Sequence, residues 1–162
     1  MAESARVEPA SPTAAREIAF TRLLDAPREL VFDVFTSPEH VKNWWGPNGF
    51  TSTIHEMDVR PGGLWRLVMH GPDGRDYHNH IVFVEVKRPE RLVFKHVPQP
   101  GTEPVSHETT IEFVDRGGRT EVTMRLVFTT ASARERLVKE YRVDEGGVQT
   151  LDRLAAYVES MT

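Results

Sequence analysis

The sequence has no cysteine, no long apolar run and no basic run interleaved with aromatic residues. The absence of cysteine excludes disulfides and a cysteine nucleophile, and it is compatible with the reducing cytoplasm. No segment approaches the roughly 20 apolar residues that cross a bilayer, and residues 1–16 lack the apolar core of a signal peptide. The net charge of −4 argues against a nucleic-acid surface. We therefore expect a soluble, cytoplasmic protein that binds neither nucleic acid nor membrane.

Signatures of established catalytic sites are also missing. The sequence has no serine elbow, no phosphate-binding loop and no HExxH pattern. Glu56 and Asp58 share one face of an expected strand near His55, but a solvated strand face explains this spacing better than an acid–base pair does. These patterns predict no catalytic residue, no metal ligand and no cofactor.

What is present fits a single domain over residues 17–160, preceded by a flexible arm over residues 1–16. Residues 17–24 alternate as a first strand. Pro27 then begins a short helix, because proline suits the first helical position. A second short helix follows Ser37-Pro38 and ends at Trp45, before Gly46-Pro47.

From residue 51 onward the apolar pattern has a period of two, with turn residues between the segments. We expect six further strands, near residues 51–58, 64–70, 77–86, 91–97, 107–114 and 120–128. Short links favour an antiparallel meander, which makes seven strands in all. The fold class is therefore α+β, with two short helices after the first strand and a long helix at the end.

Residues 133–160 form the only long segment with helical periodicity, and its apolar stripe needs a partner. A curved sheet wrapped around this helix is the economical solution. Gly146-Gly147 in its middle costs about 1 kcal/mol per glycine in a helix. Either the helix breaks there, or another part of the chain approaches too closely for a side chain.

Seven short motifs appear in the order typical of a known family. They are Asp25–Phe32 (DAPRELVF), Ser37–His40 (SPEH), Trp44–Pro47 (WWGP), Pro61–Trp65 (PGGLW), Gly71–Gly74 (GPDG), Pro89–Phe94 (PERLVF) and Gly146 with Thr150–Leu154 (TLDRL). The chain thus resembles the START-like, birch-pollen-allergen-type helix-grip (SRPBCC) superfamily over residues 17–160. More narrowly, it is similar to bacterial homologues of the activator of the heat-shock protein 90 ATPase. The resemblance implies a seven-stranded curved sheet gripping the C-terminal helix, and a cavity between them.

Strand alternation predicts which side chains face that cavity. The expected apolar lining is Trp65, Leu67, Met69, Phe94, Thr109, Ile111 and Met124, with Val148 and Leu151 on the helix side. Such a lining suits a small-molecule site. The same residues also suit a solid core, and the resemblance favours the cavity.

The same strand alternation predicts where the histidines lie. If Val82, Val84 and Val86 face inward, His78 and His80 do too. A turn at residues 87–90 that pairs Val86 with Leu92 then brings His96 close, and the next hairpin adds His107. The alternatives are a polar pocket mouth that contacts a ligand, a metal site and unrelated surface histidines. A one-residue bulge would turn His78 and His80 outward.

Trp44 and Trp45 end the second short helix. Most tryptophans are structural, so core packing is the favoured interpretation. The alternative is that one ring packs in the core while the other lies at the cavity entrance, as a gate or a ligand contact.

Three functions are compatible with these features. The first is binding of a small apolar or aromatic molecule in the sheet–helix cavity, oriented by His78, His80 and His96. The second is an enzyme of the polyketide-cyclase or hydrolase kind, with histidines as general acid and base. The third, implied by the family name, is a co-chaperone-like module of the stress response, and it ranks last. A homodimer is compatible with an exposed sheet face, although the outer residues expected there are mostly charged: Arg66, Lys95, Glu108 and Arg125.

Overall fold

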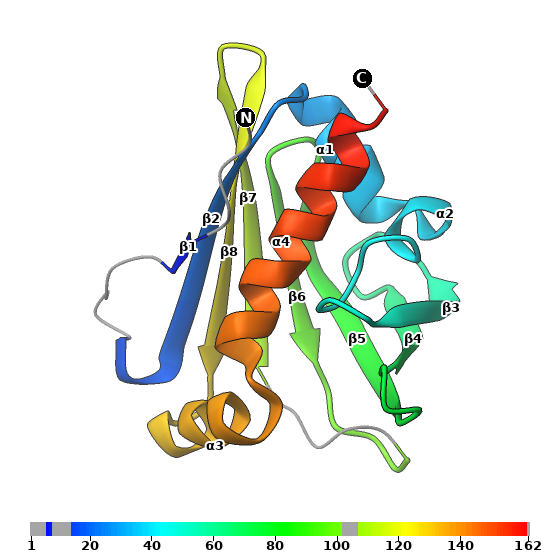
Figure 1. Cartoon of the computed structure of the whole chain (residues 1–162), viewed down its shortest axis with the longest axis vertical. Helices are drawn as coiled ribbons and strands as arrows, with labels where there is room; N and C mark the ends of the chain where they lie inside the picture. The colour runs from blue at the N-terminus through cyan, green and yellow to red at the C-terminus, as the bar shows by residue number, and fades with distance from the viewer. Residues whose placement is uncertain (1–5, 8–13, 102–106, 162) are drawn as a thin grey trace.

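The computed structural model describes residues 6–7, 14–101 and 107–161 (Figure 1). The strands are β1 (Arg6–Val7), β2 (Glu17–Leu24), β3 (Thr51–Met57), β4 (Leu64–His70), β5 (Asp76–Lys87), β6 (Arg91–His96), β7 (His107–Arg116) and β8 (Arg119–Phe128). The helices are α1 (Arg28–Thr36), α2 (Pro38–Val41), α3 (Ala131–Tyr141) and α4 (Val143–Glu159), with a 3-10 turn at Ala14–Arg16.

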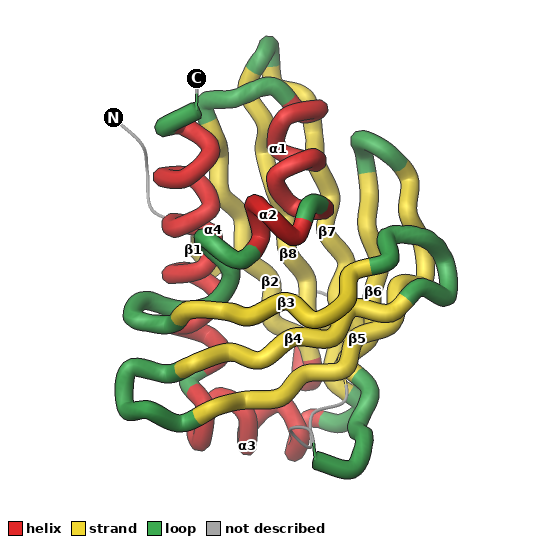
Figure 2. Tube along the Cα trace, turned by 90° about the vertical axis from the view of Figure 1, so that its right-hand side faces the viewer, coloured by secondary structure: helices red, strands yellow, loops and turns green. Residues whose placement is uncertain are grey.

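All strands belong to one antiparallel sheet in the order β1-β2-β8-β7-β6-β5-β4-β3. The seven predicted strands are confirmed as β2–β8, and the two-residue β1 adds an eighth beside β2. β1 and the turn at 14–16 belong to the segment predicted as a flexible arm, whose other residues lie outside the described residues. In Figure 2, β3–β5 run across the view while β2, β7 and β8 run along it, so the sheet is strongly curved.

The C-terminal segment forms two helices that meet at Arg142. This residue has φ 53° and ψ 44°, a left-handed conformation that is uncommon for a side chain other than glycine. Its backbone N–H donates to the carbonyl of Val138 at 3.0 Å and closes α3. The break thus lies four residues before the glycine pair, and Gly146-Gly147 is part of a regular α4.

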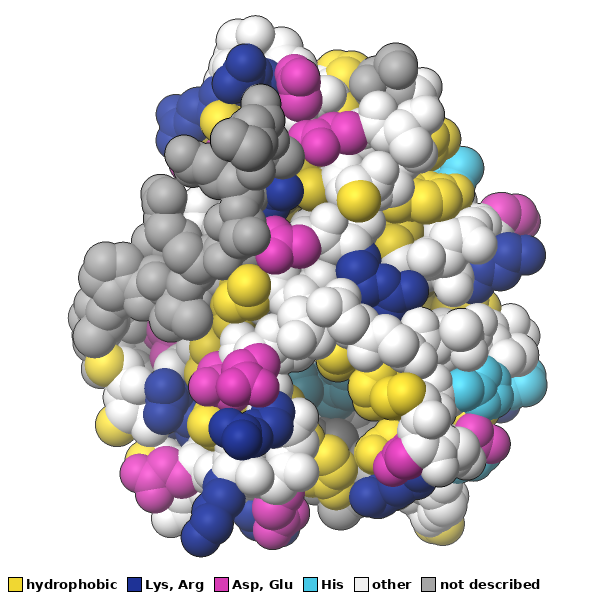
Figure 3. Space-filling model, in the orientation of Figure 1, with side chains coloured by type: hydrophobic (Ala, Val, Ile, Leu, Met, Phe, Trp, Pro, Cys, Tyr) yellow, Lys and Arg dark blue, Asp and Glu magenta, His cyan; other side chains and the backbone are white. Residues whose placement is uncertain are grey.

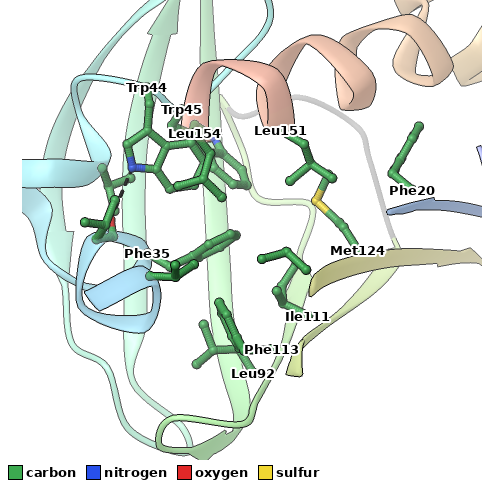
Figure 4. Close-up of a cluster of buried hydrophobic side chains, with 14 of the residues drawn as sticks. Phe20, Phe35, Trp44, Trp45, Leu92, Ile111, Phe113, Met124, Leu151 and Leu154 are labelled. Carbon is green, nitrogen blue, oxygen red and sulfur yellow. Dashed lines mark hydrogen bonds between the residues drawn. The ribbon is translucent and has the colours of Figure 1, made fainter. Parts of the chain in front are cut away.

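The core lies between α4 and the inner face of the sheet, with α1 at one end. Figure 4 shows Leu151 and Leu154 of α4 directed toward side chains of the sheet and of α1, among them Met124 and Phe35. An ion pair also joins the helix to the sheet, because Nε of the buried Arg22 of β2 lies 2.9 Å from Oδ1 of the partly exposed Asp152 of α4. The predicted α+β architecture, a curved sheet gripping a C-terminal helix, is therefore confirmed.

Over residues 6–7, 14–101 and 107–161, no helix has the length and apolar character needed to cross a membrane.

Candidate functional site

A pocket of about 340 Å³ lies between the inner face of the sheet and the C-terminal helices. Side chains of β2 and β4–β8, the loop at residues 45–50, α3 and the first two turns of α4 line it. Figure 3 shows a hollow in the molecular surface, below the middle of the view, with histidine atoms visible inside it. Its volume lies within the range of roughly 300–1,000 Å³ that is typical of small-molecule sites.

Six of the residues predicted to contact a ligand line this pocket: Trp45, Met69, Phe94, His96, Thr109 and Met124. Four others fill the neighbouring core instead, namely Trp44, Trp65, Leu67 and Ile111, each at most 2% exposed. The inner face of the sheet is therefore partly solid core and partly pocket.

Aromatic packing explains why that core is solid. The Trp65 ring lies 4.9 Å from the ring of Trp45 and 5.6 Å from that of Phe94, measured between centroids. Trp44 is fully buried, and its indole N–H donates to the carbonyl of Val34 at 3.2 Å, the dashed line in Figure 4. One tryptophan of the pair thus packs in the core, while Trp45 reaches the pocket.

The helix side of the pocket was predicted at Val148 and Leu151, and this placement is wrong. Leu151 is fully buried in the core, and Val148 packs against the core beside it. The pocket meets α4 earlier, at Val143, Gly146, Gly147 and Thr150. The reason is the break at Arg142, which starts α4 beside the pocket and leaves its first two turns to cover it.

The glycine pair is explained by close approach. A Cβ atom added to Gly147 would lie 2.3 Å from Cζ of Phe20, much closer than real Cβ atoms come to other heavy atoms. A Cβ atom at Gly146 would lie 3.1 Å from Cγ of Pro47. Phe20 and Pro47 both line the pocket. The two glycines therefore allow α4 to pack closely against Phe20 and Pro47. Of the two alternatives raised by the sequence, a helix break or a close approach, the structure shows the close approach.

His78 and His80 were predicted to face inward, and this is wrong. β5 contains a bulge between Phe83 and Glu85, so that Val84 has no partner on β6 and is 45% exposed. Val86 pairs with Leu92 as predicted, but the extra residue reverses the parity of the strand before it. Tyr77 and Asn79 consequently line the pocket, while His78 is exposed and His80 lies on the outer face with it.

The two histidines that do reach the pocket lie side by side. His96 of β6 pairs directly with His107 of β7, and their rings stack with centroids 4.3 Å apart and planes 20° apart. His107 also lies 5.0 Å from the ring of Phe128 on β8. The Nδ1 atoms of both histidines are buried without a hydrogen-bond partner among the described residues.

Burial determines the charge of this pair. Removal from water lowers the pKa of His96 well below its ordinary value, and the neighbouring His107 lowers it further. Removal from water also lowers the pKa of His107, to about 4. Both imidazoles are therefore neutral near pH 7, and each has one nitrogen that donates and one that accepts.

Aromatic residues from three segments meet at the rim. Tyr77 of β5 lies 5.7 Å from Phe50 and 6.4 Å from Tyr141 at the end of α3, measured between ring centroids. The guanidinium carbon of Arg75 lies 4.6 Å from the Tyr77 ring centroid. The charged lining residues Arg75, Glu140 and Arg142 are exposed, so charge is confined to the rim.

A histidine–carboxylate contact occurs on the other side of the sheet. His70 Nδ1 lies 2.7 Å from Asp76 Oδ1, and its Nε2 lies 2.8 Å from the hydroxyl of Thr53. None of these residues lines the pocket. The described part of the chain also contains no group of three or more histidine or acidic side chains placed to hold a metal ion.

Sequence reasoning missed several lining residues. Tyr77 and Asn79 would have followed from the correct strand parity, and His107 was expected near His96 but not assigned to the site. Phe50, Tyr141 and Arg142 come from loops or helix ends, for which periodicity gives no signal.

The family described as "Activator of Hsp90 ATPase homolog 1-like protein" matches residues 25–159, most of the chain. The chain belongs to this family. No curated protein matches it.

Solved structures similar to this member of the Activator of Hsp90 ATPase homolog 1-like family share its fold. A solution structure from Arthrobacter aurescens has a TM-score of 0.85 at 20% identity and covers 96% of this chain and 91% of that one. A crystal structure from Nitrosomonas europaea has a TM-score of 0.79 at 25% identity, with 96% and 100% covered. A third, called AHSA1 protein, from Silicibacter pomeroyi, has a TM-score of 0.73 at 18% identity, with 90% and 99% covered.

Proposed function

We propose that this protein binds one small apolar or aromatic molecule in the pocket between its sheet and its C-terminal helices. The observation that carries the proposal is the pocket itself: about 340 Å³ of space in a domain whose neighbouring core is tightly packed. Phe20, Trp45, Phe94 and Met124 supply apolar walls, and a few polar groups supply orientation. The proposed setting is the cytoplasm.

The pocket histidines favour binding over acid–base catalysis. Neither His96 nor His107 has a carboxylate partner among the described residues. A histidine whose pKa is about 4 is also a weak base near pH 7. The histidine that does contact a carboxylate, His70, lies outside the pocket. These features support a role in which the imidazoles orient a ligand.

The test combines copurification with a pocket-filling variant. Native mass spectrometry of the freshly purified protein should show a bound small molecule, and the neutral dye N-phenyl-1-naphthylamine should bind with one-to-one stoichiometry and enhanced fluorescence. Leu126→Trp places a large ring in the pocket and should weaken dye binding at least tenfold. Val84→Trp makes a similar enlargement on the outer face of the sheet and should leave binding unchanged.

Two outcomes contradict the proposal. The first is absence of both a copurifying molecule and dye binding. The second is equal dye affinity in the two tryptophan variants, because the dye would then be bound outside the pocket.

A chaperone partner is a second candidate, favoured by the family to which the chain belongs. It predicts that the purified protein retains the bacterial homologue of heat-shock protein 90 in a pull-down at micromolar concentration. Absence of retention would remove this candidate and leave the small-molecule proposal unaffected.

A further inference from the structure

The polar groups of the pocket wall are concentrated at one place on the sheet. His96 and His107 are paired residues on neighbouring strands, and Asn79 follows on the next strand, two residues before the partner of His96. The Asn79 amide already donates to the carbonyl of Tyr77 at 3.1 Å. This wall thus offers a ligand the paired imidazoles of His96 and His107 and, beside them on β7, the hydroxyl of Thr109.

No described residue fixes the protonation pattern of either imidazole. In most structures a partner on one ring nitrogen determines whether the other nitrogen donates or accepts. Here both Nδ1 atoms are buried without a partner among the described residues, and both side chains line the pocket. Each ring can consequently present either a donor or an acceptor.

A hydroxyl group matches such a pair better than a charged group does. It donates one hydrogen bond and accepts others, so one ring can accept from it while the other donates to it. A carboxylate only accepts and would bring a full charge beside two neutral, desolvated rings. An ammonium only donates, and it too would bring a full charge beside the desolvated rings.

The remaining walls favour a flat ring. Phe20, Trp45 and Phe94 line the pocket, and Phe50 and Tyr77 adjoin them at the rim. Aromatic side chains bind flat rings by offset stacking and edge contacts. The charged groups Arg75, Glu140 and Arg142 lie at the rim, away from the imidazole pair that is buried in the wall.

We propose that the pocket selects a neutral aromatic compound with a ring hydroxyl, which exchanges hydrogen bonds with the imidazoles of His96 and His107. This inference rests on the proposed small-molecule function and adds the ligand's chemical class.

Four probes of one ring system test it: naphthalene, 2-naphthol, 2-methoxynaphthalene and 2-naphthoate, measured by displacement of N-phenyl-1-naphthylamine. One or two neutral hydrogen bonds correspond to about tenfold in affinity, so 2-naphthol should bind about tenfold tighter than naphthalene. The methoxy compound accepts but cannot donate, and it should lose most of this advantage. The affinity of 2-naphthol should be constant between pH 6 and pH 8.

Variants then locate the effect. His96→Phe and His107→Phe should each remove most of the preference for 2-naphthol over naphthalene while naphthalene still binds. His78→Phe, on the outer face, is the matched control and should keep the full preference. Because the comparison of probes on the unaltered protein needs no variant, the inference remains testable even where a substitution prevents folding.

The outcomes separate the two proposals. If no probe and no dye binds, the small-molecule function itself is wrong. If naphthalene and 2-naphthol bind equally, the pocket is real but the inference about the hydroxyl is wrong. If 2-naphthoate binds tightest, and more so toward pH 6, the site takes an anion together with a proton, and the neutral class is refuted.

Discussion

Replacing Gly147 by alanine should destabilise the protein even though alanine is the better helix former. The new Cβ would lie 2.3 Å, 2.4 Å and 2.8 Å from three atoms of the Phe20 ring. Phe20 is fully buried, so its ring escapes only by tilting into the pocket that it lines. Overpacking of this kind costs about 1–3 kcal/mol.

Gly146→Ala is the matched control, because it gains the same roughly 1 kcal/mol of helix propensity. Its Cβ would meet only Pro47, at 3.1 Å and 3.8 Å, on a partly exposed loop that can yield slightly. The Gly147 variant should therefore be less stable than the Gly146 variant by about 1–3 kcal/mol, and it should bind N-phenyl-1-naphthylamine more weakly.

Urea unfolding followed by tryptophan fluorescence measures this difference. Phe20→Leu introduced together with Gly147→Ala should recover part of the loss, since the smaller side chain leaves room for the added methyl group. If the two alanine variants are equally stable, the explanation of the glycine pair by close approach is refuted.

Three further predictions follow from other contacts. Because burial lowers the pKa of His107 from 6.5 to about 4, the unfolded chain binds a proton between these pH values that the folded chain does not. The free energy of unfolding is therefore undiminished by this group above pH 6.5 and falls by about 3 kcal/mol as the pH decreases toward 4. Urea unfolding of His107→Phe should show a smaller decrease over the same pH range. Arg153 donates to the carbonyls of residues 46 and 47 at 2.9 Å each, so Arg153→Met should cost about 1–3 kcal/mol in thermal or urea unfolding; an unchanged midpoint would show that α4 does not hold this loop. His78→Ala and His80→Ala on the outer face should each change stability by less than about 0.5 kcal/mol, and a larger loss would mean that these side chains have packing roles.

Most of the strand positions could be predicted from the sequence, because alternation and turn residues are local signals. The exception is the facing of β5. Residues 81–86 read Ile-Val-Phe-Val-Glu-Val, with apolar side chains on both parities. Neither facing is favoured by such a run, and the bulge at Val84 is set by its pairing with β6. The misplacement of His78 and His80 follows from this one ambiguity.

The break in the C-terminal helix has a different origin. Glycine is the residue expected in a left-handed conformation, yet here Arg142 adopts it and the glycines lie within α4. Gly147 is instead required by the close approach of the Phe20 ring, and Phe20 is more than a hundred residues away along the chain. Such a contact leaves no mark in local periodicity, so the sequence could raise the question of the glycine pair without deciding it.

The unpaired residue at Val84 also decides which side chains of β5 reach the pocket. If the same residues paired with β6 without a bulge, Val86 would stay inward while His78 and His80 turned toward His96 and His107, and Ile81 and Phe83 would leave the core. Four imidazoles around one cavity form a ligand set suited to zinc or copper. The bulge instead places Tyr77 and Asn79 on the wall, so one extra strand residue separates a pocket suited to an organic molecule from a cluster of metal ligands.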